Sequence, residues 1–76
     1  MAWRMNPRDG CRLFIREFPG MKRRLYEYDS REGRVYRVRL KDGARLVPSW
    51  IGIRHLMNRA RYREIIPPHL QVPEGL

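Results

Sequence analysis

Turn-forming residues divide the middle of this chain into short segments. The strongest turn signals fall at Pro19-Gly20, at residues 29–33, at Asp42-Gly43 and at Pro48. The segments between these signals are rich in aromatic and β-branched residues, a composition typical of strands. The predicted strands cover residues 11–18, 22–28, 34–40 and 44–47. We expect them to form a small antiparallel sheet of three to four strands.

Loop length and the apolar pattern predict how these strands pair. A three-residue loop at 41–43 places Val38 opposite Leu46, whereas a two-residue turn would mix apolar and charged side chains on one face. A five-residue loop at 29–33 places Tyr26 opposite Tyr36 by the same reasoning. The predicted core face consists of Tyr26, Tyr28, Tyr36, Val38, Leu40, Ala44 and Leu46.

The opposite face of this predicted sheet carries arginines. In the predicted register Arg39 and Arg45 lie directly opposite one another, with Arg37 beside them. Like charges in such positions repel each other unless an anion or a carboxylate relieves them. The pattern therefore has two interpretations, and both stay open. Either the arginines form an anion-binding surface, or their charges are balanced by Glu27 or by solvent around the extended side chains.

From Ser49 onward the apolar period becomes helical, and we predict a C-terminal helix over residues 49–64 with Ser49 as its N-cap. One stripe of this helix would pack on the sheet, and it contains Trp50, Ile53, Leu56, Met57 and Ala60. Ile51 and Tyr62 would then lie on the outer side, where they would contact a partner. Arg54 and Arg61 would flank the stripe.

The two ends are predicted to be extended. Residues 1–10 form an N-terminal arm, residues 11–66 a single β-rich domain, and residues 67–76 a proline-rich tail. Trp3 in the arm and the aliphatic side chains of the tail, including Leu70 and Val72, are candidate partner contacts. The tail would pack on its own domain, pack on a partner, or be disordered.

Charge is the strongest functional signal. The net charge is +9, and of 17 basic residues only Lys22 and Lys41 are lysines. Arginine offers a planar set of donors for phosphate and stacks on bases, although a GC-rich genome would also enrich it. The first predicted strand alternates arginine and phenylalanine, which suits phosphate contact combined with base stacking; the residues are Arg12, Phe14, Arg16 and Phe18.

Other classes of protein receive little support. A single cysteine, Cys11, excludes a disulfide-stapled secreted fold and a multi-thiolate metal site. No apolar run approaches the length of a membrane span. His55 and His69 have no ligand or catalytic partner at a recognisable spacing, and no phosphate-loop or metal motif is present. We expect a protein that is not an enzyme and has no cofactor, inside a cell.

The sequence thus predicts a small basic α+β protein that binds nucleic acid, RNA in preference to DNA, as an RNA-binding module or a ribonucleoprotein subunit. The candidate nucleic-acid contacts are Arg12, Arg16, Arg37, Arg39, Arg45, Arg54 and Arg61. The alternative is a non-catalytic accessory subunit of an organellar, photosynthetic or phage assembly, whose arm and tail wrap neighbouring subunits. Its candidate contacts are Trp3, Ile51, Tyr62, Leu70 and Val72. The order of elements resembles curled SH3-like or OB-like barrels in outline, and no family resemblance is specific enough to name.

Overall fold

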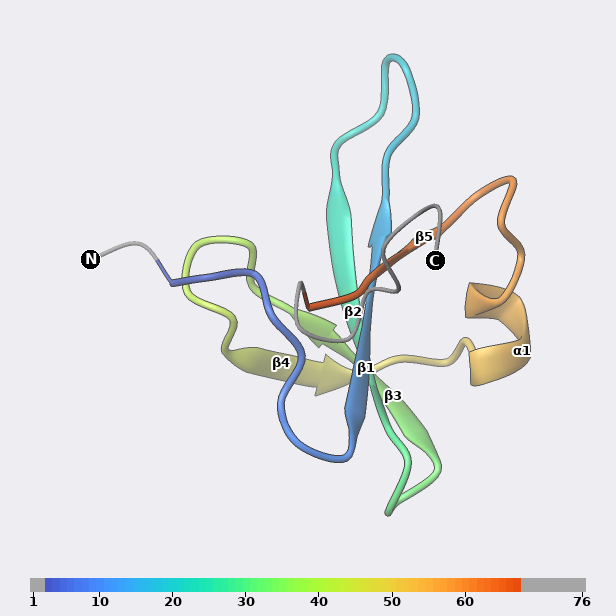
Figure 1. The fold of residues 1–76 in the computed structure, drawn as a ribbon. Coiled ribbons are helices and arrows are strands. Elements are labelled where there is room, and N and C mark those ends of the chain that lie inside the picture. Colours follow the sequence, from blue (N-terminus) through green and yellow to red (C-terminus); the bar gives the residue numbers. More distant parts are fainter. Residues whose placement is uncertain (1–2, 68–76) are drawn as a thin grey trace, which may run out of the picture.

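The computed structural model describes residues 3–67, which contain one five-stranded antiparallel sheet and one short helix (Figure 1). The elements are β1 (Cys11–Arg16), β2 (Arg24–Asp29), β3 (Arg34–Val38), β4 (Arg45–Pro48), α1 (Ile53–Leu56) and β5 (Arg63–Ile65). Their order in the sheet is β4-β3-β2-β1-β5, so the last strand returns to pair with the first. The predicted small antiparallel sheet is confirmed, with a fifth strand that was not expected.

The predicted register of β2, β3 and β4 is wrong by one residue. Tyr26 lies opposite Arg37 rather than Tyr36, and Val38 lies opposite Arg45 rather than Leu46. Between β3 and β4 the ladder itself is irregular, with a register shift between Tyr36 and Val38. Between β2 and β3 the cause is the turn after β2, where the Asp29 carboxylate accepts backbone hydrogen bonds from the next turn residues and the Asp29 carbonyl accepts one from Gly33. This capping keeps Asp29 inside the ladder, so the turn has one residue fewer than predicted and the faces are exchanged.

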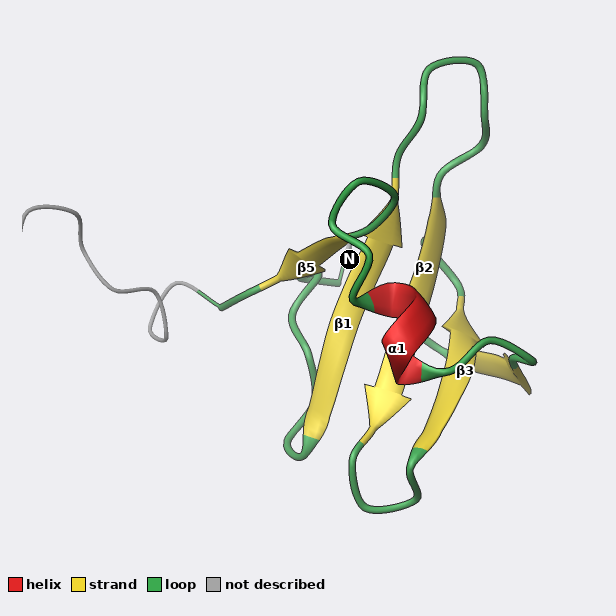
Figure 2. Ribbon diagram, turned by 90° about the vertical axis from the view of Figure 1, so that its right-hand side faces the viewer, coloured by secondary structure: helices red, strands yellow, loops and turns green. Residues whose placement is uncertain are grey.

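Side chains are buried on both faces of the sheet. One core cluster consists of Phe14, Tyr26, Val35, Ile51, Leu56 and Tyr62. It lies under α1 and its flanking segments, which cover the face formed by β1, β2 and β3 (Figure 2). The second cluster consists of Leu13, Ile15, Leu25 and Val38, with Trp3, Met5, Leu40 and Ile65 packed against it. We call these the helix-side and arm-side faces, because α1 and the N-terminal arm lie on opposite sides of β1 (Figure 1).

The predicted helix over 49–64 is also wrong, because α1 is a single turn. Gly52 precedes it in an extended conformation, and no side chain caps it. The Ser49 hydroxyl accepts a hydrogen bond from the nearby Ile51 N–H instead of capping a helix. Asn58 then forms a turn with Ala60 through its side chain, and the chain continues into β5 beside β1. The pairing of β5 with β1 therefore replaces the second half of the predicted helix.

This rearrangement reverses the expected exposure of several side chains. Ile51 and Tyr62, predicted to face outward, are only 6% and 7% exposed and belong to the helix-side core. Trp50, predicted to be in the core, is 91% exposed. An extended segment alternates its side chains residue by residue, so Trp50 and Ile51 point to opposite sides, whereas a helix would have placed them about 100° apart.

The N-terminal arm docks on its own chain. Trp3 Nε1 donates a hydrogen bond of 2.8 Å to the Leu40 carbonyl, and Arg8 Nη2 donates one of 2.6 Å to the Gly43 carbonyl. Gly43 has φ +76°, and a Cβ there would lie 2.7 Å from the Trp3 ring. The turn between β3 and β4 thus needs glycine both for its conformation and for the close approach of the indole.

Of the predicted proline-rich tail, only Pro67 falls within the described residues, where it is buried. Leu70 and Val72 lie outside them. Among residues 3–67, no helix has the length and hydrophobicity required to cross a membrane.

Candidate functional site

A pocket of about 490 Å³ lies at one end of the helix-side face, where four arginines converge. Three come from adjacent strands and one from the loop before β5: Arg16, Arg24, Arg37 and Arg61. Aromatic side chains line the same space, namely Phe18, Tyr26, Trp50, His55 and Tyr62. We call this site the cationic pocket. None of its lining residues is acidic.

Strand pairing brings the first three arginines together. Arg16 and Arg24 lie directly opposite one another at the end of the β1–β2 ladder. Arg37 lies opposite Tyr26, which is two residues from Arg24 on the same side of β2. Because successive residues of a strand alternate between faces, all three side chains lie on the helix-side face. The pocket is therefore a direct product of the observed register.

These arginines are not neutralised within the part of the chain that the structure describes. No carboxylate of residues 3–67 lies within ion-pair distance of Arg16, Arg24, Arg37 or Arg61. The Arg16 Nε atom is buried and has no hydrogen-bond partner among the same residues. Directly opposed like charges on a sheet repel, so an anion in this pocket would relieve an unfavourable interaction.

The positive field extends to the buried Tyr62 at the base of the pocket. Burial raises the pKa of its hydroxyl, and the neighbouring Tyr26 raises it further. The charges of Arg16, Arg61 and Arg24 act in the opposite direction on the same pKa, because a cation favours the phenolate. The charges of these three guanidinium groups therefore act on the same side chain of the pocket lining.

A series of aromatic rings connects the surface with the core. The Trp50 ring contacts His55 edge-to-face at 6.0 Å between centroids, and His55 contacts Tyr62 at 5.6 Å. Tyr62 in turn contacts Tyr26 at 5.8 Å. Tyr26 and Tyr62 are buried, whereas His55 is exposed and the Trp50 indole is almost fully exposed. The pocket therefore combines cationic groups with an exposed aromatic surface.

Arg45, predicted to bind nucleic acid, forms part of a buried ionic network on the arm-side face. Its Nε donates to Glu27 Oε1 at 2.5 Å and its Nη2 to Asp29 Oδ2 at 2.9 Å, while its guanidinium lies 4.3 Å from the centre of the Tyr36 ring. The hydrogen bond from Arg45 lowers the pKa of Asp29, and its carboxylate partners raise the pKa of Arg45. The prediction that Arg39 lies opposite Arg45 is wrong, because Val38 occupies that position. The alternative prediction, that Glu27 balances the positive charge, is confirmed for Arg45.

The Cys11 thiol lies beside this network, 3.5 Å from Arg45 Nη2. Burial is the main cause that raises its pKa, and the charges of Glu27 and Asp29 raise it further. The thiolate form is therefore disfavoured, and the thiol is a weak nucleophile.

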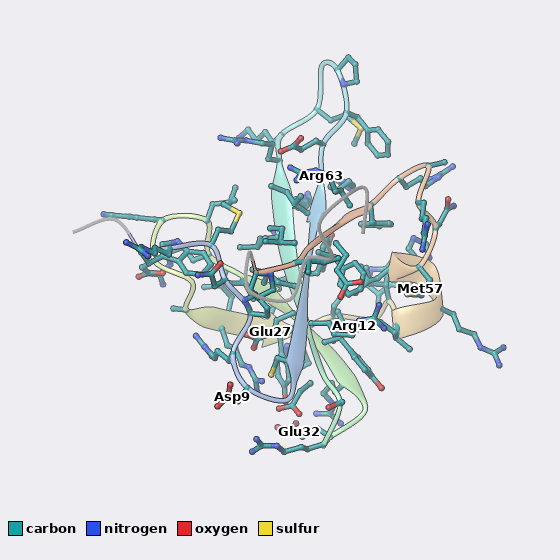
Figure 3. The ribbon with its side chains drawn as sticks, viewed as in Figure 1. Asp9, Arg12, Glu27, Glu32, Met57 and Arg63 are labelled. Carbon is teal, nitrogen blue, oxygen red and sulfur yellow. The ribbon has the colours of Figure 1, made fainter. Side chains whose placement is uncertain are left out.

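Two more predicted contacts are engaged in ion pairs. Arg12 forms a bidentate pair with Glu64, at 2.8 and 2.7 Å, and this pairing lowers the pKa of Glu64. Figure 3 shows Arg12 directed toward Met57 on the helix side, away from Glu27. Arg39 pairs with Asp42 at 3.1 Å. Arg54 is exposed on α1 and is not among the residues that line the cationic pocket.

Of the seven predicted arginines, the structure thus brings three into one site: Arg16, Arg37 and Arg61. Sequence reasoning missed Arg24 and Trp50. Arg24 was identifiable in principle, since it lies opposite Arg16 once the hairpin between β1 and β2 is placed. Trp50 carried no such signal, because the predicted helix placed it inward.

The described residues do not form a metal centre: within 3–67 no three His, Cys, Asp or Glu side chains are grouped so that they could hold an ion. Comparisons with known protein families, with curated proteins and with solved structures find no match for this chain.

Proposed function

We propose that this protein binds nucleic acid through the cationic pocket, as a non-catalytic RNA-binding module or ribonucleoprotein subunit. The observation that carries the proposal is the convergence of four arginines with no acidic residue in the lining. A phosphate bound there would accept charge-assisted hydrogen bonds from more than one guanidinium and would relieve the repulsion between Arg16 and Arg24.

The distribution of the remaining charges supports this assignment. On the arm-side face, Glu27 and Asp29 are buried and paired with Arg45. Near the other end of the helix-side face, Glu64 pairs with Arg12. The ion pairs among the described residues all lie outside the pocket, so the four pocket arginines keep their positive charge, which would attract a polyanion.

The test is binding of a fluorescently labelled single-stranded RNA, measured by anisotropy over a range of salt concentrations. We expect Arg37→Gln to weaken binding and to reduce the slope of log K against log salt by about 0.7, the value for one lost phosphate contact on a single strand. Arg34→Gln is the matched control, because Arg34 belongs to the same strand but does not line the pocket. Equal effects of the two substitutions would contradict the site.

The accessory-subunit hypothesis retains one structural argument. The edge strand β4 carries Leu46 and Val47, which are 44% and 54% exposed, so it offers an apolar edge to a neighbouring protein. Against it, Trp3 is bound within its own chain. Sedimentation of the native material before and after nuclease treatment distinguishes the two: loss of a fast form on treatment supports nucleic-acid binding, and a nuclease-resistant complex supports the accessory role.

We also infer a specific barrel-like fold from the arrangement of strands. The order β4-β3-β2-β1-β5 and the single helical turn before β5 are features of SH3-like barrels. Such folds serve many functions, so the functional proposal rests on the pocket alone.

A further inference from the structure

Trp50 is the most exposed large apolar side chain of the described residues, and it lies on the rim of the cationic pocket. The chain around it is held firmly. The Ser49 N–H donates a 2.8 Å hydrogen bond to the Val35 carbonyl, and the following Ile51 is buried in the helix-side core. An indole presented from an anchored backbone offers its ring to a ligand at a low cost in conformational entropy.

The size of the pocket suits a single nucleotide. Its volume of about 490 Å³ lies within the range of small-molecule sites, about 300–1,000 Å³. A base inside a duplex is stacked on both sides, so its ring faces are not accessible to a protein side chain unless it is extruded. A base of a single strand presents a free ring face together with its phosphate.

Resting on the function proposed above, we propose that the cationic pocket takes one unpaired nucleotide of a single strand, with its base stacked on Trp50 and its phosphate bound between Arg16 and Arg24. The pairing of these arginines across β1 and β2 provides two guanidinium groups for one phosphate. Arg37 and Arg61 lie in the same lining and extend the cationic surface for neighbouring phosphates. Base stacking then accounts for an exposed tryptophan beside an arginine cluster.

The test compares four polyanions: an oligouridine of about 12 nucleotides, its deoxy counterpart, an RNA duplex of the same length, which carries about twice the charge of one strand, and inorganic polyphosphate, which has no bases. Anisotropy or competition gives each affinity for the unmodified protein. We expect the single strands to bind more tightly than the duplex. Trp50→Ala should weaken single-strand binding about tenfold, and Trp50→Phe should retain most of it. Polyphosphate binding should be unaffected by either substitution.

Fluorescence provides a second readout. In a Trp3→Phe background Trp50 is the sole tryptophan of the chain, and its emission should be quenched by the oligouridine but not by polyphosphate. Because Trp3 forms a hydrogen bond to Leu40, an unfolding curve of this variant checks that it is folded. The comparison of the four ligand affinities uses the protein with Trp3 unchanged, so it tests the proposal even if the Trp3→Phe variant does not fold.

The outcomes separate this inference from the proposed function. Equal affinity for duplex and single strand, with no effect of Trp50→Ala, would overturn the single-nucleotide assignment and leave nucleic-acid binding intact. A lack of affinity for all three nucleic acids would overturn both. Tighter binding of the ribose strand than of the deoxyribose strand would identify RNA as the preferred source of the nucleotide, and the reverse would identify DNA.

Discussion

Arg16 on β1 and Arg24 on β2 are direct cross-strand partners, with no carboxylate of the described residues within ion-pair distance of either. This chain has acidic residues that neutralise other arginines, including a bidentate partner for Arg12. The repulsion between these two unpaired arginines therefore lowers the stability of the free protein, and a bound anion would restore that stability.

We predict that Arg24→Gln stabilises the free protein while it weakens nucleic-acid binding. Removal of one of two opposed like charges should raise the free energy of unfolding by about 0.5 kcal/mol at low salt, and the gain should shrink as salt screens the repulsion. Chemical denaturation at two salt concentrations measures this change. Arg54→Gln, an exposed arginine outside the pocket, is the control and should leave stability unchanged. A destabilised Arg24→Gln would show that Arg16 and Arg24 do not repel each other.

A second prediction concerns the buried ionic network. Arg45→Met should lower the free energy of unfolding by about 2–3 kcal/mol, because it leaves the Glu27 carboxylate, 3% exposed, without its hydrogen-bonded cation. The double variant Arg45→Met with Glu27→Gln should recover part of the loss, since the buried charge of Glu27 is then removed as well. Thermal or denaturant unfolding provides the measurement. Equal stability of Arg45→Met and the unmodified protein would show that the network contributes nothing to the fold.

The third prediction concerns acid. The pKa of Asp29 is lowered chiefly by its hydrogen bond from Arg45, and that of Glu64 chiefly by its hydrogen bond from Arg12. A carboxyl group whose pKa is lower in the folded than in the unfolded state contributes stability above its unfolded pKa, which is near 3.8 for Asp and 4.5 for Glu. That contribution disappears as the pH falls through the folded pKa. We therefore expect the melting temperature to fall progressively below about pH 4.5.

Glu64→Gln identifies the contribution of one of these groups. The variant should be less stable at neutral pH and should lose less melting temperature on acidification, because the amide that replaces the carboxylate has no proton to take up. Parallel melting curves of both proteins across the acid range test this, and an identical loss on acidification would exclude Glu64 as a source of the effect.

A fourth prediction concerns the docking of the arm. Gly43→Ala should destabilise the protein by more than about 1 kcal/mol, because alanine is strained at φ +76° and its Cβ would meet the Trp3 ring. Trp3→Ala alone should also destabilise, through loss of apolar contact and of the hydrogen bond to Leu40. In the double variant the clash is absent, so the total loss should be smaller than the sum of the single losses. Strict additivity would show that the indole does not lie on Gly43.

Local sequence signals predicted the first four strands to within a few residues, because turn residues and aromatic or β-branched segments act over short ranges. The register depended on whether the Asp29 side chain capped the turn, and one residue of difference exchanged the two faces. The last strand was missed because Arg63–Ile65 is short and carries no alternating pattern of its own. Its pairing with β1, which lies about fifty residues earlier, stabilises it.

The candidate site was predictable only in part for the same reason. An excess of arginine is visible in the sequence, but the sequence does not show which arginines the few acids neutralise. Glu64, for example, is 52 residues from Arg12. Trp50 and Ile51 exchanged their expected roles because one helical turn, preceded by the extended Gly52, replaced a long helix. Ion pairs and strand pairing between residues far apart in the sequence thus determined which side chains are free to bind a ligand.

The most direct test of the central claim is an NMR titration of the ¹⁵N-labelled protein with the oligouridine. The two tryptophans should give separate indole N–H signals, because Trp3 is hydrogen-bonded within the chain and Trp50 lies at the pocket. We predict large shifts for the Trp50 indole and for the amides of Arg16, Arg24 and Arg37, with the Trp3 indole unchanged. Shifts confined to the arm-side face, or no shifts at all, would contradict the assignment of the cationic pocket as the nucleic-acid-binding site.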